Sequence, residues 1–220
     1  MDVDSFYKKK LNYSWHRIRK YLKPKQDPEE YQAKIIQLCG LLWLEKQGFT
    51  KIYYADESGF NLTPYIPYGW QEKGNPICIV PSKSKSINAF GLFTRDNELA
   101  IYTSEQNING DLAIAFIDDF CRSMKQPSTI VIDNAPIHHS SNFKDKIQEW
   151  EEQGLYVFYL PRYSPHLNLI ETLWRKIKYE WLKAHHYLNW HTFATALNYI
   201  FCNIGNEFTI NFKDQLAENI

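Results

Sequence analysis

The chain has 220 residues, of which 44% are hydrophobic and 16% aromatic, and its 25 Lys and Arg are balanced by 25 Asp and Glu. This composition is typical of a folded globular protein and excludes a disordered or fibrous chain. No apolar run approaches the roughly 20 residues that span a membrane, and no long apolar segment follows the lysines at positions 8–10, so we expect neither a membrane partner nor a secretory leader.

Residues 8–25 form a basic segment without a single acidic residue. Within it, residues 14–22 predict a short helix with Ser14 as N-cap, which Pro24 stops. The segment is either a solvated arm or, because aromatic side chains interleave the charges, a surface that contacts phosphates. Its candidate contacts to a DNA backbone are Arg17, Arg19 and Lys20.

The other elements follow in chain order from hydrophobic periodicity and turn residues. Helices are predicted at 29–47, 110–124, 141–153, 169–184 and 190–204, and strands at 51–56, 77–80, 86–93, 98–103, 129–133 and 155–160. Strands followed by alternating helices and strands indicate an α/β protein with an RNase H-like fold, a mixed five-stranded sheet flanked by helices, preceded by a short helical extension. In this fold the strands at 51–56 and 129–133 end side by side.

Three acidic residues stand in three separate motifs: Asp56 in YYADESGF, Asp133 in IVIDNAPIHHS and Glu171 in YLPRYSPHLNLIETLW. Two of them close predicted strands and the third opens a predicted helix, so the fold can bring them together. Carboxylates are the ligands that Mg²⁺ prefers, and two ions about 3.5 to 4 Å apart support phosphodiester chemistry. Taken singly, each Asp also fits a turn, and Glu171 also fits a capping box with Asn168 as N-cap.

These motifs resemble the catalytic domain of DDE-type transposases of the Tc1/mariner and IS630 superfamily, with the IS630 type as the nearest match. The resemblance covers about residues 51–190. It implies that Asp56, Asp133 and Glu171 bind two Mg²⁺ or Mn²⁺ ions, cut double-stranded DNA at terminal inverted repeats and join the 3′-hydroxyl to a TA target. It also implies an active homodimer that bridges two transposon ends.

The residues near the three acids have narrower predicted roles. Glu57 follows Asp56 on a strand and should point to the opposite face, where it supports the site rather than adding a ligand. Asn134 and His138 could orient a carboxylate or contact the scissile phosphate, although a surface imidazole is the commoner case. Apolar residues of the last motif, including Trp174, are predicted core contacts. Further candidate contacts to the DNA backbone are Arg162, Arg175 and Lys178.

The chain departs from the family pattern at two places. Leu169 replaces a proline that usually precedes the final Ile-Glu pair, which should affect stability slightly. Residues 1–48 fit only a remnant of a helix-turn-helix DNA-binding region and a linker helix, ahead of a catalytic domain at 49–220. We therefore expect one of three origins, which remain open: a truncated relic, the second reading frame of an element expressed by frameshifting, or a catalytic domain kept for another use. The rival functions are a stand-alone RNase H-like nuclease and an inactive fragment that binds DNA or a partner transposase.

The four cysteines are widely separated and form no CxxC pair. This spacing argues against a zinc site and favours buried free thiols in a reducing compartment. We therefore expect a cytoplasmic, bacterial protein that joins the nucleoid when it binds DNA. The cysteines are Cys39, Cys78, Cys121 and Cys202.

Overall fold

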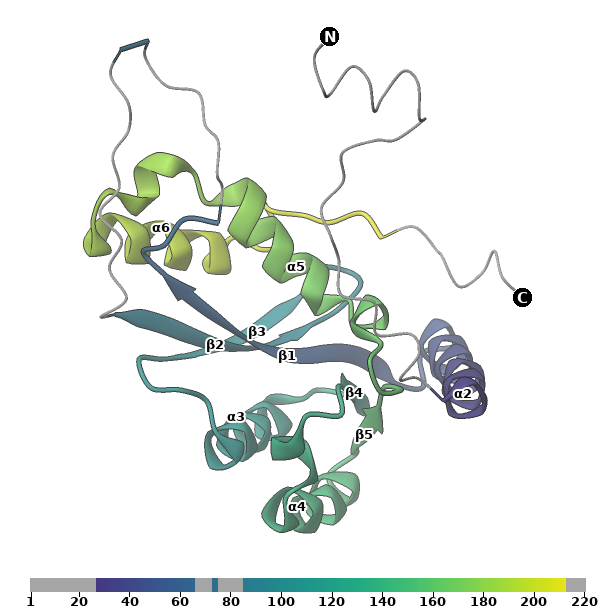
Figure 1. Ribbon diagram of the computed structural model, residues 1–220. Coiled ribbons are helices and arrows are strands. Elements are labelled where there is room, and N and C mark those ends of the chain that lie inside the picture. Colours follow the sequence, from purple (N-terminus) through teal and green to yellow (C-terminus); the bar gives the residue numbers. More distant parts are fainter. Residues whose placement is uncertain (1–26, 66–72, 75–84, 213–220) are drawn as a thin grey trace, which may run out of the picture.

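The computed structural model describes residues 27–65, 73–74 and 85–212 (Figure 1). The predicted helix at 14–22, the basic residues Arg17, Arg19 and Lys20, and the predicted strand at 77–80 lie outside this part of the chain. The strands are β1 (Lys51–Asn61), β2 (Ser86–Phe93), β3 (Leu99–Ser104), β4 (Ser128–Ile132) and β5 (Leu155–Tyr159). The α-helices are α2 (Pro28–Lys46), α3 (Gly110–Ser123), α4 (Ser141–Glu152), α5 (Ile170–Lys176) and α6 (Trp190–Cys202).

The five strands form one mixed sheet in the order β3-β2-β1-β4-β5. The pairs β1–β2 and β2–β3 are antiparallel, whereas β1–β4 and β4–β5 are parallel. This topology confirms the predicted RNase H-like fold. Because β1 and β4 are parallel neighbours, the segments that follow their paired residues emerge at the same edge of the sheet.

Helices cover both faces of the sheet. Successive side chains along each strand point to opposite faces, so they contribute to two separate hydrophobic cores. Tyr54 and Ala89 face the layer that contains α5 and α6. Their neighbours Ala55 and Phe90 face α3 and α4. Figure 1 shows these two helix layers on opposite sides of the strands. The central strand β4 is buried at every position, as expected for a parallel strand covered on both faces.

Local sequence signals explain why the helices begin and end near their predicted positions. The Asp27 carboxylate accepts a hydrogen bond from Glu29 N at the start of α2, and Ser140 Oγ accepts one from Phe143 N at the start of α4. Gly48 and Gly154 follow α2 and α4 with φ values of 77° and 85°, which only glycine adopts without strain.

The structure differs from the prediction in the length of β1 and in the helix that follows the last motif. Antiparallel pairing with β2 extends β1 to Asn61, so Asp56 lies inside a strand and not at its end. The parallel pairing with β4 stops at Tyr54, which leaves Asp56 just beyond the end of β4. The predicted helix at 169–184 is α5 followed by a π-helical turn, Ile177–Trp181, and extended backbone at Leu182.

Among the described cysteines, only Cys121 is a buried free thiol, whereas Cys39 is partly exposed and Cys202 is exposed. The prediction of buried thiols is therefore right for Cys121 and wrong for Cys202, and Cys78 lies outside the described residues. Within the described part of the chain, none of the helices has the length and apolar character needed to cross a membrane.

Candidate active site

The three acids of the sequence motifs line one cavity of about 640 Å³. Asp56 reaches it from β1, Asp133 from the residue after β4, and Glu171 from the first turn of α5. The parallel β1–β4 pairing and the packing of α5 on the same end of the sheet bring these residues together across the chain. The positions of the acids therefore agree with the convergence that the motifs predict.

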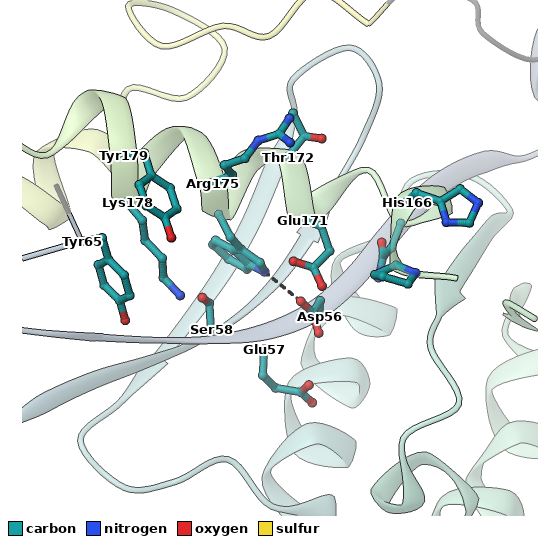
Figure 2. A pocket seen from close by; sticks show the side chains of 13 residues that line it. Asp56, Glu57, Ser58, Tyr65, His166, Glu171, Thr172, Arg175, Lys178 and Tyr179 are labelled. Carbon is teal, nitrogen blue, oxygen red and sulfur yellow. Dashed lines mark hydrogen bonds between the residues drawn. The ribbon is translucent and has the colours of Figure 1, made fainter. Parts of the chain in front are cut away.

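A second cavity of about 690 Å³ adjoins the first, because Asp56, Asn168 and Glu171 line both. In Figure 2 the Asp56 and Glu171 carboxylates lie together, while Glu57 leaves β1 on the other side of the strand. Glu57 thus points to the opposite face from Asp56, as predicted. We call the two adjoining cavities together the trough; Asp56 and Glu171 line both of them, and Asp133 lines the first.

Burial and mutual repulsion raise the pKa values of the acids. The pKa of Asp56 rises to about 8, chiefly because the carboxyl is buried and then because Glu171, Glu57 and Asp133 are near. Burial and the charge of Asp133 raise the pKa of Glu57 to about 7. Glu171 is exposed on one side, yet loss of water raises its pKa as well, against the opposing effect of Lys178. Such a cluster is stabilised by a cation.

Asn168 and Trp174 hold the residues around Asp56. The Asn168 amide donates from Nδ2 to the carbonyl oxygen of Ala55 over 3.0 Å. The Trp174 indole donates from Nε1 to Asp56 Oδ2 over 3.2 Å. Trp174 is buried in the core as predicted, but its polar contact with Asp56 was not predicted. An indole has one hydrogen-bond donor, and here it is used on a carboxylate. The two residues are far apart in the sequence, so no local pattern identifies this contact.

The predicted capping box at the start of α5 is wrong. Leu169 occupies the N-cap position with helical dihedral angles, and in the described chain no side chain caps this helix. The Asn168 side chain turns instead toward β1, because the Ala55 carbonyl lies just past the end of the β1–β4 pairing and accepts its amide. Glu171 is consequently not used as a cap and faces the cavity.

His138 is fully buried, so the expectation of a surface imidazole is wrong. A 3₁₀ turn, Pro136–His139, folds the ring inward, where it packs 5.4 Å from the ring of Phe143. Its Nε2 atom lies 3.6 Å from Asp133 Oδ1 and 3.7 Å from Glu57 Oε1. Burial lowers the pKa of His138 to about 4, so the ring is neutral at pH 7.

Asn134 braces the loop that carries Asp133. Its Nδ2 donates to the carbonyl oxygen of Leu160, and its Oδ1 lies 3.0 Å from His139 Nε2. His139 in turn stacks on Tyr159 with 4.7 Å between the ring centroids. Asn134 also lines the first cavity, so its position suits support of the loop as well as contact with a substrate.

Basic side chains stand on both arms of the trough. Arg175 and Lys178 line the second cavity, whereas Arg162 and Lys144 line the first. Lys178 is half-buried, with Nζ 5.0 Å from the ring centroid of Tyr65, and burial lowers its pKa. Lys144 lies on the helix after the second motif and was missed, because a lone lysine on an amphipathic helix carries no distinguishing pattern.

Within the described residues, no group of three or more His, Cys, Asp or Glu side chains is arranged to hold a metal ion by itself. The donors nevertheless fit a divalent cation, because they are carboxylate oxygens with raised pKa values around one cavity. Glu57 Oε1 is also buried without a hydrogen-bond partner in the described chain. Mg²⁺ is held by one or two carboxylates together with water and substrate phosphates, so a closed protein cage is not required.

A mixed five-stranded sheet with acids from β1, from the residue after β4 and from α5 at one cavity is the architecture of an RNase H-like core of the DDE type. Residues 51–193 match the family described as DDE superfamily endonuclease, and the chain belongs to this family. The predicted resemblance is thereby confirmed.

One relative by sequence is the insertion element IS630 uncharacterized 39 kDa protein of Shigella sonnei. It is 26% identical over 131 residues, a match that covers 57% of this chain and 37% of the relative. The matched region therefore spans well under half of that protein's length.

Two solved structures of Mos1 transposase share the fold. The Mos1 strand transfer complex has a TM-score of 0.54 at 13% identity, covering 90% of this chain and 60% of the other. The paired-end complex with the left transposon end has a TM-score of 0.55 at 12% identity, covering 90% and 61%.

Proposed function

We propose that this chain is the catalytic core of an IS630-type transposase. In this proposal Asp56, Asp133 and Glu171 hold two Mg²⁺ or Mn²⁺ ions, cut DNA at the terminal inverted repeats of an element and join the freed 3′-hydroxyl to a TA target. The observation that carries the proposal is the meeting of these three carboxylates, from three distant motifs, at one cavity.

The charges around the acids support a phosphodiester substrate. A DNA strand that lies along the trough would pass its phosphates near Arg175 and Lys178 on one side of the acids and near Arg162 and Lys144 on the other. Contacts of this kind supply affinity that does not depend on sequence. The acids at the centre would repel the same strand unless cations neutralise them.

Each part of the site has a task in this proposal. Bound metal would activate a water or hydroxyl and stabilise the oxygen that leaves phosphorus. The carboxylates of Asp56, Asp133 and Glu171 would hold it. Asn134, with its hydrogen bond to Leu160, keeps the loop that carries Asp133 at the end of β4. His138, neutral and buried between Glu57 and Asp133, separates these two carboxylates without adding charge.

The substrate and assembly are proposed by analogy. The Mos1 structures that share the fold are described as a strand transfer complex and a paired-end complex with a transposon end. We propose double-stranded DNA as the substrate and a homodimer as the active form. We further propose that residues 49–220 are the catalytic domain, that residues 1–48 belong to a DNA-binding region and its linker helix, and that the protein acts in the bacterial cytoplasm.

A joining assay separates this function from its rivals. The protein is incubated with Mn²⁺ or Mg²⁺, a DNA duplex that ends in a pre-cut 3′-hydroxyl, and a plasmid target rich in TA steps. A transposase core joins the end to the target, and sequencing of the junctions reveals TA at the insertion sites. A stand-alone nuclease degrades the duplex and yields no joined product. An inactive fragment binds the DNA and yields neither product.

A further inference from the structure

Two buried side chains hydrogen-bond to β1 on either side of Glu171 in the sequence. We propose that Asn168 and Trp174 are positioning residues that set the relation between the Asp56 and Glu171 carboxylates, and thereby the affinity of the site for divalent metal. The proposal rests on the proposed function and assigns a task to two residues that the acidic motifs alone do not identify.

The first contact is made by Asn168, three residues before Glu171. Its side chain is 4% exposed, and Nδ2 donates over 3.0 Å to the carbonyl oxygen of Ala55, the residue before Asp56. Its Oδ1 atom is buried and has no hydrogen-bond partner among the described residues. Asn168 also lines both cavities of the trough. Breaking the bond to Ala55 would leave the buried amide donor unsatisfied as well, which is costly, so this bond constrains the position of Asn168.

The second contact is made by Trp174, three residues after Glu171. Its ring is 3% exposed and packs edge-on against Phe60, with 5.9 Å between the ring centroids. The only donor of the indole, Nε1, is used on Asp56 Oδ2. Packing fixes the ring, and the ring in turn fixes one oxygen of the carboxylate; the dashed line that ends at Asp56 in Figure 2 marks this hydrogen bond. Because the two oxygens belong to one planar carboxylate, the bond to Oδ2 also sets the direction of Asp56 Oδ1.

A third feature allows α5 to approach β1 closely enough for both contacts. Gly91 pairs with Asp56 across β1 and β2. A Cβ atom at this position would lie 2.8 Å from Ile170 Cδ1 and 2.8 Å from Trp174 Cη2. Real contacts of this kind are essentially never so short, so the packing of α5 against the sheet beside Asp56 requires glycine.

These contacts work together because of their spacing. Asn168 and Trp174 lie three residues before and three residues after Glu171, so the segment that carries Glu171 is tied to consecutive residues of β1 at both ends. The backbone at Glu171 cannot move away from β1 without straining these two hydrogen bonds. Like-charged carboxylates repel, so two free side chains would separate in the absence of metal. The two contacts hold them near each other before metal arrives.

The test measures metal binding directly. Mn²⁺ binding to the full chain is followed by calorimetry for the wild type, Trp174→Phe and Asn168→Ala. Trp174→Phe removes the N–H and keeps an aromatic ring, and Asn168→Ala removes the amide. Loss of a residue that orients a metal ligand typically weakens metal binding about 10- to 100-fold, and we expect a change of this size for each variant.

Two control variants separate positioning from a general loss of packing. Trp181→Phe alters a partly buried tryptophan at the end of the π-helical turn, which packs against Phe208. Asn203→Ala removes an amide that donates to the Tyr199 carbonyl, the same type of bond as that of Asn168. Both controls should bind Mn²⁺ as the wild type does. In DNA cleavage, Trp174→Phe should need about tenfold more metal for half-maximal rate and recover most of the maximal rate at saturating metal.

The outcomes are distinct. Circular dichroism gives the melting temperature of each variant and shows whether it is folded. Wild-type affinity for Mn²⁺ in both Trp174→Phe and Asn168→Ala overturns the positioning role and leaves the proposed function standing. A wild-type chain that neither binds Mn²⁺ nor cleaves DNA in its presence overturns the proposed function itself, and the positioning role with it. If one variant loses its cooperative unfolding transition, the other variant decides.

Discussion

His138 Nε2 lies 3.6 Å from Asp133 Oδ1, although the imidazole is completely buried and Asp133 is about half exposed. The imidazole also packs against Phe143, with 5.4 Å between the ring centroids. The second motif thus supplies both an acid that lines the cavity and a buried imidazole next to that acid. The relation has a direct consequence for substitution at this position.

His138→Phe should preserve packing and weaken the site. A phenyl ring of similar size keeps the contact with Phe143, so the free energy of unfolding should change by less than about 1.5 kcal/mol. Loss of the polar ring atoms near Asp133 and Glu57 should lower the rate of metal-dependent DNA cleavage at subsaturating metal several-fold. His191→Phe, on exposed α6 surface, is the control. Equal cleavage rates in His138→Phe and the wild type would remove His138 from the site.

The raised pKa of Asp56 predicts a pH-dependent penalty in the metal-free protein. The carboxyl ionises near pH 4 in an unfolded chain but near pH 8 in the folded one. The unfolded state therefore loses its proton first, and the folded state is progressively destabilised as the pH rises from about 4 to about 8. Metal binding should reverse this penalty.

Asp56→Asn removes the charge and keeps an oxygen that can accept the Trp174 N–H. In EDTA at pH 8 the variant should exceed the wild type in free energy of unfolding by about 1 to 3 kcal/mol, and the difference should vanish near pH 4. Urea denaturation at both pH values measures it. A variant that is less stable than the wild type at pH 8 would contradict the account of repelling, buried carboxylates.

Gly91→Ala should be destabilising despite the small change in size. Its Cβ would collide with Ile170 and Trp174, and overpacking of this kind costs about 1 to 3 kcal/mol. Gly110→Ala is the matched control, because a Cβ there meets its nearest atom at an ordinary 3.7 Å. Thermal unfolding compares the two. Equal melting temperatures would show that α5 has room to move away from β1.

Lys178→Met should weaken DNA binding without disturbing the fold. Methionine keeps an apolar stem beside Phe60 and Tyr65 and removes the charge. If the ammonium contacts a phosphate, the dependence of log affinity on log salt should become shallower by about one unit. Lys176→Met is the control, since Lys176 pairs with Glu180 and lines neither cavity. Binding should be weak and independent of sequence in all three proteins, and an unchanged slope in Lys178→Met would exclude the contact.

The sequence predicted the sheet and the meeting of the acids because both depend on patterns that are local. Apolar runs before Asp56 and Asp133 identify two strands, and the order of elements makes those strands parallel neighbours. The position of Glu171 follows from the helix after the third motif. None of these inferences requires knowledge of a particular tertiary contact.

The sequence did not predict the contacts of Asn168 and Trp174 or the burial of His138, because each depends on a tertiary partner. Asn168 has the residue type and position of an N-cap, and only the nearby Ala55 carbonyl draws it away from the helix. Trp174 fits a core position by periodicity, and its hydrogen bond to the Asp56 carboxylate depends on the packing of α5 against β1. The burial of His138 depends on how the 3₁₀ turn packs on α4.

Cleavage of labelled double-stranded DNA by the wild type and by Asp133→Asn, at graded Mg²⁺ and Mn²⁺ concentrations, tests the central claim most directly. Asparagine keeps an oxygen that can accept the hydrogen bond from Ala135 N, so the loop should stay folded while one charged ligand is lost. The account predicts cleavage that requires metal in the wild type and is reduced at least about 100-fold in Asp133→Asn. Equal, metal-independent cleavage by both proteins would contradict it.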